Sequence, residues 1–309
     1  MNSNGYHDPS APLPAVTEDL WEANASWWQE RFTEGADPEY SEQIVPLLAD
    51  ALAGARPESV LDIGCGEGQL CRVAAGVAGV RLVVGIDPTW AQLDGARRRQ
   101  ALVGQGPGPR PAVEQPDEGA VERPDEGAVE QPGEAAASPA ALVRPLYVRG
   151  AAGSLPFPSS SFDFAFACLV FEHIEGAEGA LREVGRVLRP GGTFLLMLNH
   201  PLLQAPGSGW VDDHILGEQY WRIGPYLAEH HGVEEVDKDV WLPFVHRPLS
   251  VYVNSLAAGG LYLTGMAEPA PPAGFLEKAE EYEQAAAFPR LLVLRAEKLS
   301  RAQAQPRRR

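Results

Sequence analysis

The stretch VLDIGCGEG, residues 60 to 68, places three glycines at alternate positions close to two carboxylates. Gly64, Gly66 and Gly68 allow a backbone to turn tightly and to approach a bound molecule closely. Glycine-rich turns of this kind follow the first strand in sites for nucleoside triphosphates, for dinucleotides and for S-adenosylmethionine. The neighbouring residues distinguish these three ligands.

The charge of this loop favours a cationic ligand. A nucleoside triphosphate loop needs Lys followed by Ser or Thr, whereas Gln69 and Leu70 follow Gly68. A dinucleotide loop needs its third glycine at position 69. Asp62 and Glu67 would repel a pyrophosphate, but they suit the sulfonium and ammonium groups of S-adenosylmethionine. We therefore predict that the loop binds S-adenosylmethionine.

A further carboxylate lies where the ribose of an adenosine would bind. Asp87 ends the apolar run VVGID, 25 residues after Asp62, and Pro88 follows it. A carboxylate at the end of a second strand is able to accept hydrogen bonds from both ribose hydroxyls. A strand-end turn or a helix cap is the alternative role of Asp87.

Three histidines are candidate bases, should the bound S-adenosylmethionine react with a second molecule, the acceptor. A base is needed only if the acceptor must lose a proton. His173 in FEHI, His200 in MLNHP and His246 in FVHRPLS each follow an apolar run. We predict that His173 contacts the acceptor, with an ordinary pKa of about 6 to 7. Hydrogen bonding within the fold is the alternative for all three, and Arg247 is available for an acidic acceptor group.

These residues lie in a chain whose apolar runs alternate with helical patterns. Residues 20 to 52 have a helical pattern, and predicted helices follow in EGQLCRVAAGVA, TWAQLDGARRRQAL, AEGALREVGRVL and LSVYVNSLAAGG. Predicted strands are SVLDI, RLVVGI, PLYVRG, FDFAFACLVF, TFLLMLN, LYLTGM and RLLVLRAEKL. Alternation of this kind is typical of parallel strands joined by crossover helices.

Four motifs in order resemble the class I S-adenosylmethionine-dependent methyltransferases, in particular their small-molecule branch. They read VLDIGCGEG, GIDP, GSLPFPSSSFDFAFACLVFEHI and LREVGRVLRPGGTFLLML. The resemblance covers residues 58 to about 200 without the insertion described below, and the C-terminal strands more loosely. It implies an α/β fold with a Rossmann-like doubly wound sheet. The sheet has seven strands, mostly parallel with an antiparallel last strand, and N-terminal helices and an insert form a lid.

The resemblance also implies the cofactor contacts, with Asp62 and Gly64 near the methionine end and Asp87 on the ribose. The complete prediction is Asp62, Gly64, Gly66, Gly68, Asp87, Pro88, Ala152, Gly153, Ser154, Ala167, Cys168 and Trp28. The family usually has GDA after the third strand, and the aspartate binds the adenine amino group. This chain has Ala151 at that position. Backbone groups around Ala152 and Gly153, or Ser154, would then bind the adenine.

Aromatic residues predict the walls of an acceptor site. Trp27, Trp28 and Phe32 either pack their helix on the sheet or form a lid over the cofactor. The segment 200–248 would supply the other wall, because Trp210, Tyr220, Trp221 and Tyr226 lie within it. Ligand pockets are mainly apolar with a few polar groups, so these residues predict an aromatic or polyketide-like acceptor.

One methyltransferase domain is expected over residues 15–300. Residues 1–14 are polar and rich in proline, and residues 301–309 form a basic tail, so we expect disorder at the N-terminus and a frayed C-terminus. Residues 103–140 contain an eight-residue unit repeated three times, as VEQPDEGA, VERPDEGA and VEQPGEAA. This composition buries too little apolar surface to fold. The repeat is therefore a tolerated loop insertion or, as the alternative, a partner-binding arm.

The composition narrows the partners and the compartment. The chain has 25 Lys and Arg against 42 Asp and Glu, which gives a net charge of −17. Such a surface repels nucleic acids and anionic membranes, so a small-molecule acceptor is favoured. Its three cysteines have no metal-ligand spacing, and no metal site is predicted. We expect a cytoplasmic protein, either a monomer or a homodimer, because no secretory signal or membrane-spanning run is visible.

Transfer of a methyl group to a small molecule is the leading prediction. O-methylation ranks first because histidine is a natural base for a hydroxyl group. C- and N-methylation remain open, as does a non-methylating cyclase that uses the same fold and cofactor. A non-catalytic binding protein with the acidic repeat as its arm is the remaining alternative.

Overall fold

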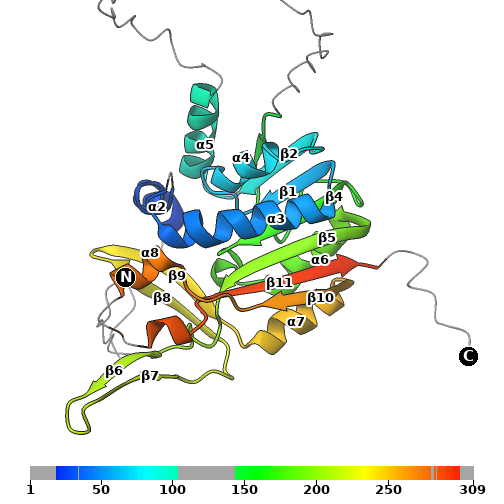
Figure 1. Ribbon diagram of the computed structural model, residues 1–309. Coiled ribbons are helices and arrows are strands. Elements are labelled where there is room, and N and C mark those ends of the chain that lie inside the picture. Colours follow the sequence, from blue (N-terminus) through cyan, green and yellow to red (C-terminus); the bar gives the residue numbers. More distant parts are fainter. Residues whose placement is uncertain (1–18, 34, 104–142, 280–281, 283, 300–309) are drawn as a thin grey trace, which may run out of the picture.

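A seven-stranded sheet forms the centre of the computed structural model, which describes residues 19–33, 35–103, 143–279, 282 and 284–299 (Figure 1). Its strands are β1 (Ser59–Ile63), β2 (Leu82–Asp87), β3 (Leu146–Arg149), β4 (Phe162–Cys168), β5 (Leu188–Asn199), β10 (Leu261–Ala267) and β11 (Leu291–Lys298). Their order is β10-β11-β5-β4-β1-β2-β3. The last strand, β11, runs antiparallel to both of its neighbours, and the pairs from β5 to β3 are parallel. The predicted fold class is confirmed.

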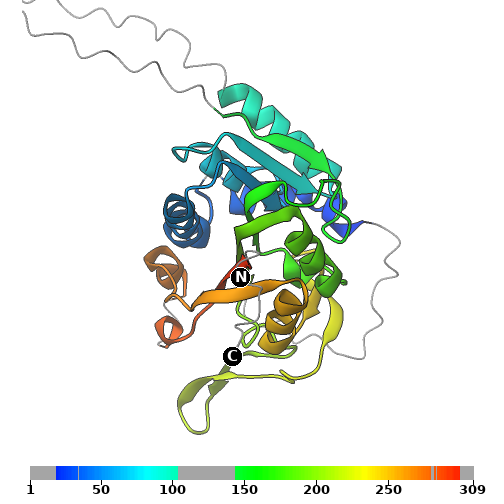
Figure 2. The same ribbon diagram turned by 90° about the vertical axis from the view of Figure 1, so that its right-hand side faces the viewer.

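Helices cover both faces of this sheet, as Figures 1 and 2 show. One face carries α3 (Val45–Ala55), α4 (Gln69–Ala75) and α5 (Trp90–Val103), and the other carries α6 (Ala177–Val187) and α7 (Leu249–Ala258). The shorter helices are α1 (Leu20–Ala23), α2 (Ala25–Phe32), η1 (Glu39–Ile44), η2 (Phe171–His173), α8 (Ala273–Lys278) and η3 (Ala285–Ala287). Within the described ranges, no helix has the length and apolar character needed to cross a membrane.

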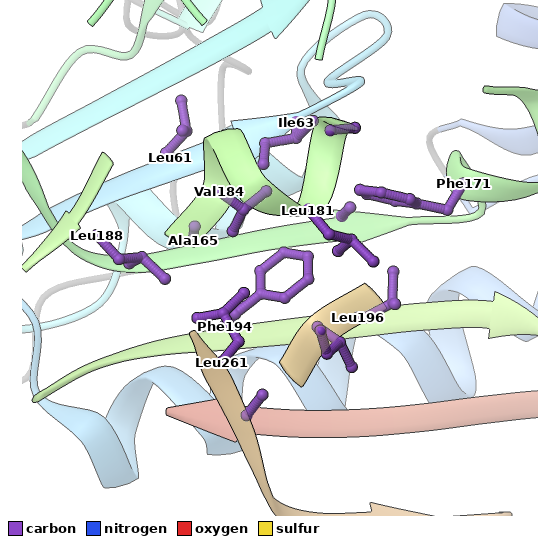
Figure 3. Packing of buried hydrophobic residues seen from close by; sticks show 14 of the residues in the cluster. Leu61, Ile63, Ala165, Phe171, Leu181, Val184, Leu188, Phe194, Leu196 and Leu261 are labelled. Carbon is purple, nitrogen blue, oxygen red and sulfur yellow. The ribbon is translucent and has the colours of Figure 1, made fainter. Parts of the chain in front are cut away.

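Alternating side chains of the central strands supply two hydrophobic cores. In β4, Phe164 and Phe166 pack toward α3 and α4, whereas Ala165 and Ala167 pack toward α6 and α7. Figure 3 shows Leu181 and Val184 of α6 around Phe194 of β5 in the second core. Because both faces are buried, these strands read as continuous apolar runs, and each buried Leu or Phe contributes roughly 1.5–3 kcal/mol.

The segment 200–248 forms two hairpins that the sequence did not predict. Strand β6 (Gly209–Asp213) pairs with β7 (Glu218–Arg222), and β8 (His230–Asp237) pairs with β9 (Val240–His246). The β6–β7 hairpin projects from the body of the protein (Figure 1), whereas β9 contacts α1 and η2. Only the β8–β9 hairpin therefore lies beside the predicted site.

Three sequence predictions fall on other parts of the chain. The N-terminal segment 1–14, the basic tail 301–309 and residues 104–140 of the acidic insertion lie outside the described residues. The extent of the methyltransferase domain, residues 15–300, stays a prediction.

Candidate cofactor and acceptor site

A cavity of about 310 Å³ lies at the carboxyl ends of β1, β2 and β4 and beside the loop that follows β3. Ligands bind at this end of the strands in open α/β sheets. The side chains of Trp21, Trp28 and Phe32 line the cavity from α1 and α2. The cavity is therefore enclosed between the sheet and the N-terminal helices.

Most of the residues predicted to bind the cofactor line this one cavity. They are Asp62, Gly64, Gly66, Asp87, Pro88, Ala152, Gly153, Cys168 and Trp28, and the candidate base His173 joins them. Gly68, Ser154 and Ala167 do not line it, which corrects the prediction for these positions. Gly68 begins α4 beneath Tyr147, Ser154 is exposed in a turn, and Ala167 is fully buried in the sheet core.

The first two glycines of the loop are required for different reasons. Gly64 has φ +71°, and a Cβ there would come within 2.5 Å of the Val170 side chain. Gly66 has φ +51°, and a Cβ there would meet nothing within 4 Å, so this backbone faces the open cavity. Both φ values are unfavourable for residues with a Cβ. The backbone at Gly66 is thus accessible to a ligand.

Asp87 connects β2 to the glycine loop. Its Oδ2 accepts a hydrogen bond from the Gly66 amide at 2.9 Å, and its Oδ1 accepts one from the Thr89 amide at 2.8 Å. The side chain is buried, and burial raises its pKa, although the two amides act in the opposite direction. The Thr89 side chain also bonds to this carboxylate, which has about four acceptor positions in all. Asp87 therefore retains capacity to accept a ribose hydroxyl of an adenosine.

Asp62 is the second buried carboxylate in the cavity wall. It is 2% exposed, and the Cys71 thiol donates a hydrogen bond to its Oδ2 at 3.2 Å. Burial raises the pKa of Asp62 to about 7. An opposite charge nearby favours the ionised form of a carboxyl group. These residues fit S-adenosylmethionine, because its ammonium and sulfonium groups supply that charge.

Glu67 does not supply the charge that the sequence assigned to it. Its carboxylate lies 2.8 Å from the Arg72 guanidinium and 3.2 Å from the Arg99 guanidinium, and its side chain is 1% exposed. Two arginines therefore neutralise Glu67 within the protein. The charge that suits a cationic ligand comes from Asp62 and Asp87 instead.

His173 presents one ring nitrogen as an acceptor. Its Nδ1 lies 2.7 Å from the Pro243 carbonyl oxygen, and a carbonyl only accepts, so Nδ1 carries the proton. The lone pair of the neutral ring is then on Nε2. The rings of Trp21 and Phe244 pack edge-on against the imidazole at 4.8 and 5.3 Å between centroids. Burial lowers the pKa of His173 to about 4, so the expected value of about 6 to 7 is wrong.

The other two candidate histidines lie outside this cavity. His200 accepts a hydrogen bond from the Leu202 amide at Nδ1, and its Nε2 lies 2.9 Å from Glu268. His246 donates from Nε2 to the Tyr226 carbonyl at 2.8 Å. The strand ends place both near the predicted rim, but local partners turn their rings away. We do not retain either histidine as a catalytic candidate.

Arg247 is not available for an acidic acceptor group. Its guanidinium donates to the carbonyl oxygens of Phe171, Ile174 and Glu175 at 3.1, 2.7 and 2.7 Å. The side chain is 2% exposed, and a further contact joins it to Glu229. Arg247 therefore fastens the turn around η2 and has a structural role.

An aromatic wall faces the glycine loop across the cavity. Trp28 stacks on Phe32 at 4.2 Å, and Trp21 meets Trp28 edge-on at 5.5 Å. Trp27 points elsewhere and donates from Nε1 to Asp237. In the β6–β7 hairpin, Trp210 stacks on Tyr282 and is not part of the cavity wall. None of the four aromatic residues predicted for the second wall, Trp210, Tyr220, Trp221 and Tyr226, lines the cavity, so the prediction of a second wall from residues 200–248 is wrong.

Sequence reasoning missed several residues of the cavity wall. They are Trp21, Thr33, Tyr40, Ile86, Thr89, Gln92, Leu169, Val170 and Ile174. Their position directly after β2 or β4, or on the N-terminal aromatic helices, was the available signal. Leu169 also has a left-handed backbone, with φ +53°. Cys65 lines the cavity, but burial raises its pKa to about 11, so it stays a thiol at neutral pH.

Known proteins share both sequence and fold with this chain. A family model described as a methyltransferase domain matches residues 124–196. An uncharacterized 37.1 kDa protein in transposon Tn4556 of Streptomyces fradiae is 30% identical over 151 residues, which are 48% of this chain and 32% of that protein. The O-methyltransferase resE of Aspergillus sclerotiorum is 25% identical over 173 residues, 56% of this chain and 52% of that enzyme.

A solved structure extends the similarity over most of the chain. The S-adenosylmethionine-dependent methyltransferase from Mesorhizobium loti is 25% identical, with a TM-score of 0.58, and the match covers 82% of this chain and 96% of that chain. The curated relatives match this chain over shorter lengths. The chain spans only about a third, or 32%, of the length of the Streptomyces protein.

Proposed function

We propose that this chain, a member of the class I S-adenosylmethionine-dependent methyltransferases, methylates a small aromatic molecule at a hydroxyl oxygen. S-adenosylmethionine is the cofactor of the family. The observation that carries the proposal is that Asp62, Asp87 and His173 line one cavity together with the glycine loop. The relationship to an O-methyltransferase over about half of the chain supports the reaction type.

Binding and orientation are the main tasks of the residues around the cavity. The bound cofactor supplies a methyl group that its sulfonium has already activated. Asp62 would pair with the cationic end of the cofactor, and Asp87 would accept its ribose hydroxyls. The backbone at Ala152 and Gly153 would contact the adenine. Correct positioning of two reactants accounts for several kcal/mol of a reaction barrier, so these contacts supply much of the catalysis.

His173 would orient the acceptor and take its proton. The lone pair on Nε2 accepts the hydrogen bond of a hydroxyl group, and the proton moves to Nε2 as the oxygen is methylated. The Pro243 carbonyl, 2.7 Å from Nδ1, stabilises the positive ring that results. The Trp21 ring and the rest of the aromatic wall exclude water from this step.

The low pKa of His173 also favours a second candidate reaction, N-methylation. A neutral amine attacks through its own lone pair and needs no base beforehand. A histidine with a pKa of about 4 is a weak base, but it serves well as a hydrogen-bond acceptor. A small acceptor is supported over nucleic acid in either case, because the net charge of −17 disfavours a polyanion.

Methyl-label transfer to a panel of phenols and anilines tests both reactions. His173→Ala should lower kcat by about 10²–10⁴ for a phenol, the usual contribution of a general base. The dissociation constant of S-adenosylmethionine should stay within a few-fold, as measured by calorimetry. His214→Ala, a change at an exposed histidine on the β6–β7 turn, is the matched control and should leave both values unchanged.

Two results would contradict the proposal. A wild-type protein that does not bind S-adenosylmethionine would exclude methyl transfer altogether. A normal kcat in His173→Ala for every accepted phenol would exclude His173 as the group that takes the proton.

A further inference from the structure

The strand β9 has one edge that pairs with β8 and a second edge that faces the site. Two carbonyl groups on the second edge accept hydrogen bonds from outside the hairpin. The Trp241 oxygen accepts from Asn24 Nδ2 at 3.1 Å, and the Pro243 oxygen accepts from His173 Nδ1 at 2.7 Å. Residues two apart in a strand direct their backbone groups to the same edge. One strand edge therefore contacts both the N-terminal helices and the candidate base.

The α1–α2 segment is also attached to the β8–β9 hairpin through Asp237. The Oδ2 atom of Asp237, at the end of β8, accepts a hydrogen bond from Trp27 Nε1 at 2.9 Å. The same oxygen lies 2.8 Å from the Arg31 guanidinium. Together with Asn24, these contacts connect a segment near residue 25 to one near residue 240. The hairpin thus helps to hold α1–α2 over the cavity, together with α5, whose Trp90 and Ala91 amides donate to Glu22.

Each of the two attached elements contributes an aromatic ring to the surroundings of His173. Trp21 from α1 meets the imidazole at 4.8 Å and 76°, and Phe244 from β9 meets it at 5.3 Å and 86°. The Pro243 carbonyl determines the tautomer of the ring, as described above. The two elements therefore define the orientation, the tautomer and the solvation of His173.

We propose that the β8–β9 hairpin and the α1–α2 segment form one positioning unit for His173, with Asp237 as its remote positioning residue. Asp237 acts through Trp27 and Arg31, which hold the segment that places Trp21 on the imidazole. The role of this unit in catalysis rests on the proposed function. The contacts that orient the His173 ring do not rest on it.

The carboxylates near this unit have other partners. On η2, Glu172 Oε1 accepts from the amide and side chain of Asn199, whereas its buried Oε2 has no hydrogen-bond partner among the described residues. On α1, Glu22 accepts from the Trp90 and Ala91 amides at the start of α5. Asp237 itself is bound to Trp27 and Arg31, and on β9 His246 donates to a carbonyl. Burial is accordingly the largest influence on the pKa of His173. Removing the Trp21 ring, which packs against the imidazole, should therefore raise the pKa of His173.

Nuclear magnetic resonance of ¹⁵N-labelled histidine side chains tests the proposal without any acceptor. In the wild type, His173 should show the Nδ1–H tautomer and a titration midpoint near 4. Asp237→Ala should move that midpoint at least one unit toward the ordinary value of about 6.5. Trp21→Leu should produce the same shift by removing the ring directly. Lys238→Ala, a change at the exposed neighbour of Asp237, should leave the titration unchanged.

A milder variant covers the case in which Asp237→Ala does not fold. Trp27→Phe removes the Nε1 donor and keeps a smaller aromatic ring for the contact with Phe32, 5.6 Å away. Unchanged tautomer and midpoint in the folded Asp237 or Trp27 variant would overturn the proposal. A shifted midpoint with an unchanged kcat would support the positioning unit and contradict the proposed catalytic role of His173. A shifted midpoint with a several-fold lower kcat and unchanged cofactor affinity would support both.

Discussion

Asp62 and Asp87 are both buried beside the glycine loop, but their surroundings favour different charge states. Two backbone amides donate to Asp87 and stabilise its ionised form. For Asp62 the described contacts include one side-chain donor, the weak Cys71 thiol, and burial raises its pKa to about 7. Asp62 is therefore about half ionised at pH 7, and a cation that pairs with it favours the ionised form.

We predict that the affinity for S-adenosylmethionine rises with pH through about 7. Below that value Asp62 holds a proton, and the protein must release it to pair with the cationic cofactor. With a pKa of about 7, the dissociation constant should be about tenfold higher at pH 6 than at pH 8, which is about 1.4 kcal/mol. Isothermal titration calorimetry at both pH values measures this ratio.

Asp62→Asn provides the control for that pH dependence. The amide keeps the size of the side chain but cannot ionise, so its affinity should be low and nearly independent of pH over this range. The same tenfold ratio in the variant would assign the pH dependence to another group.

At the scale of single residues, a role that follows from a position at the end of a strand was predictable from the sequence. Asp87 ends β2 and His173 follows β4, and both line the cavity as their places in the sequence indicated. Roles that depend on a distant partner were not predictable. Glu67 is neutralised by Arg99, which lies on α5, and nothing in the loop sequence reveals that contact. His173 was expected to titrate normally because its two aromatic neighbours come from remote segments.

At the scale of elements, η2 is a short turn whose carbonyl groups need partners. A single 3-10 turn leaves carbonyls without hydrogen bonds inside the helix. Arg247, which lies between β9 and α7, donates to Phe171, Ile174 and Glu175 around this turn. A planar guanidinium is able to serve several carbonyls at once, whereas an ammonium group is more compact. Arg247 therefore maintains the turn that carries His173.

Arg247→Lys should destabilise the protein by about 2–4 kcal/mol, because buried carbonyls lose their donors at roughly 1–3 kcal/mol each. Urea unfolding followed by tryptophan fluorescence measures the loss. Arg182→Lys is the control, since Arg182 lies on the exposed face of α6, with its side chain 55% exposed, and should change stability by less than about 0.5 kcal/mol. Equal stabilities for the two variants would show that the carbonyls find other donors.

The strands of the central sheet were predictable, but the two hairpins were not. Strands β1, β2, β4 and β5 are mostly buried, so their sequences are mainly continuous apolar runs, whereas β3 is a partly exposed edge strand. The β8 sequence HHGVEEVD leaves half of its residues exposed, and β9 contains Pro243, which argues against a central strand. The pattern over residues 200 to 248 was therefore too weak to predict the hairpin that contacts His173.

At the scale of the whole molecule, the cavity and the points at which the acidic insertion joins the described fold lie on opposite sides of the sheet. The cavity lies at the carboxyl ends of the strands, and the loop after β3 contributes Gly150 and Ala151 to it. The insertion joins the end of α5 at Val103 to the amino end of β3 at Leu146. In a parallel sheet, the carboxyl ends of the strands lie together on one side and their amino ends lie together on the opposite side. The described residues that flank residues 104–142 therefore lie on the side of the sheet away from the cavity.

Replacing residues 107 to 138 with a short Gly-Ser linker should leave the fold and cofactor binding unchanged. The repeat is rich in Pro, Glu, Gly and Ala, which have little apolar surface to bury, so its removal deprives the core of nothing. Shortening a long loop changes its closure entropy only slightly. The melting temperature should stay within about 2 °C, which corresponds to about 0.5 kcal/mol for a protein of this size.

A second variant that scrambles the order of residues 107 to 138 separates spacing from sequence. If the insertion acts only as a spacer, the scrambled and shortened proteins should match the wild type in melting temperature and in S-adenosylmethionine affinity. A fall of many degrees in both variants would mean that the repeat packs on the domain in a sequence-dependent way. Loss of methyl transfer with unchanged stability and cofactor affinity would instead favour the alternative role of the repeat, a partner-binding arm required for turnover.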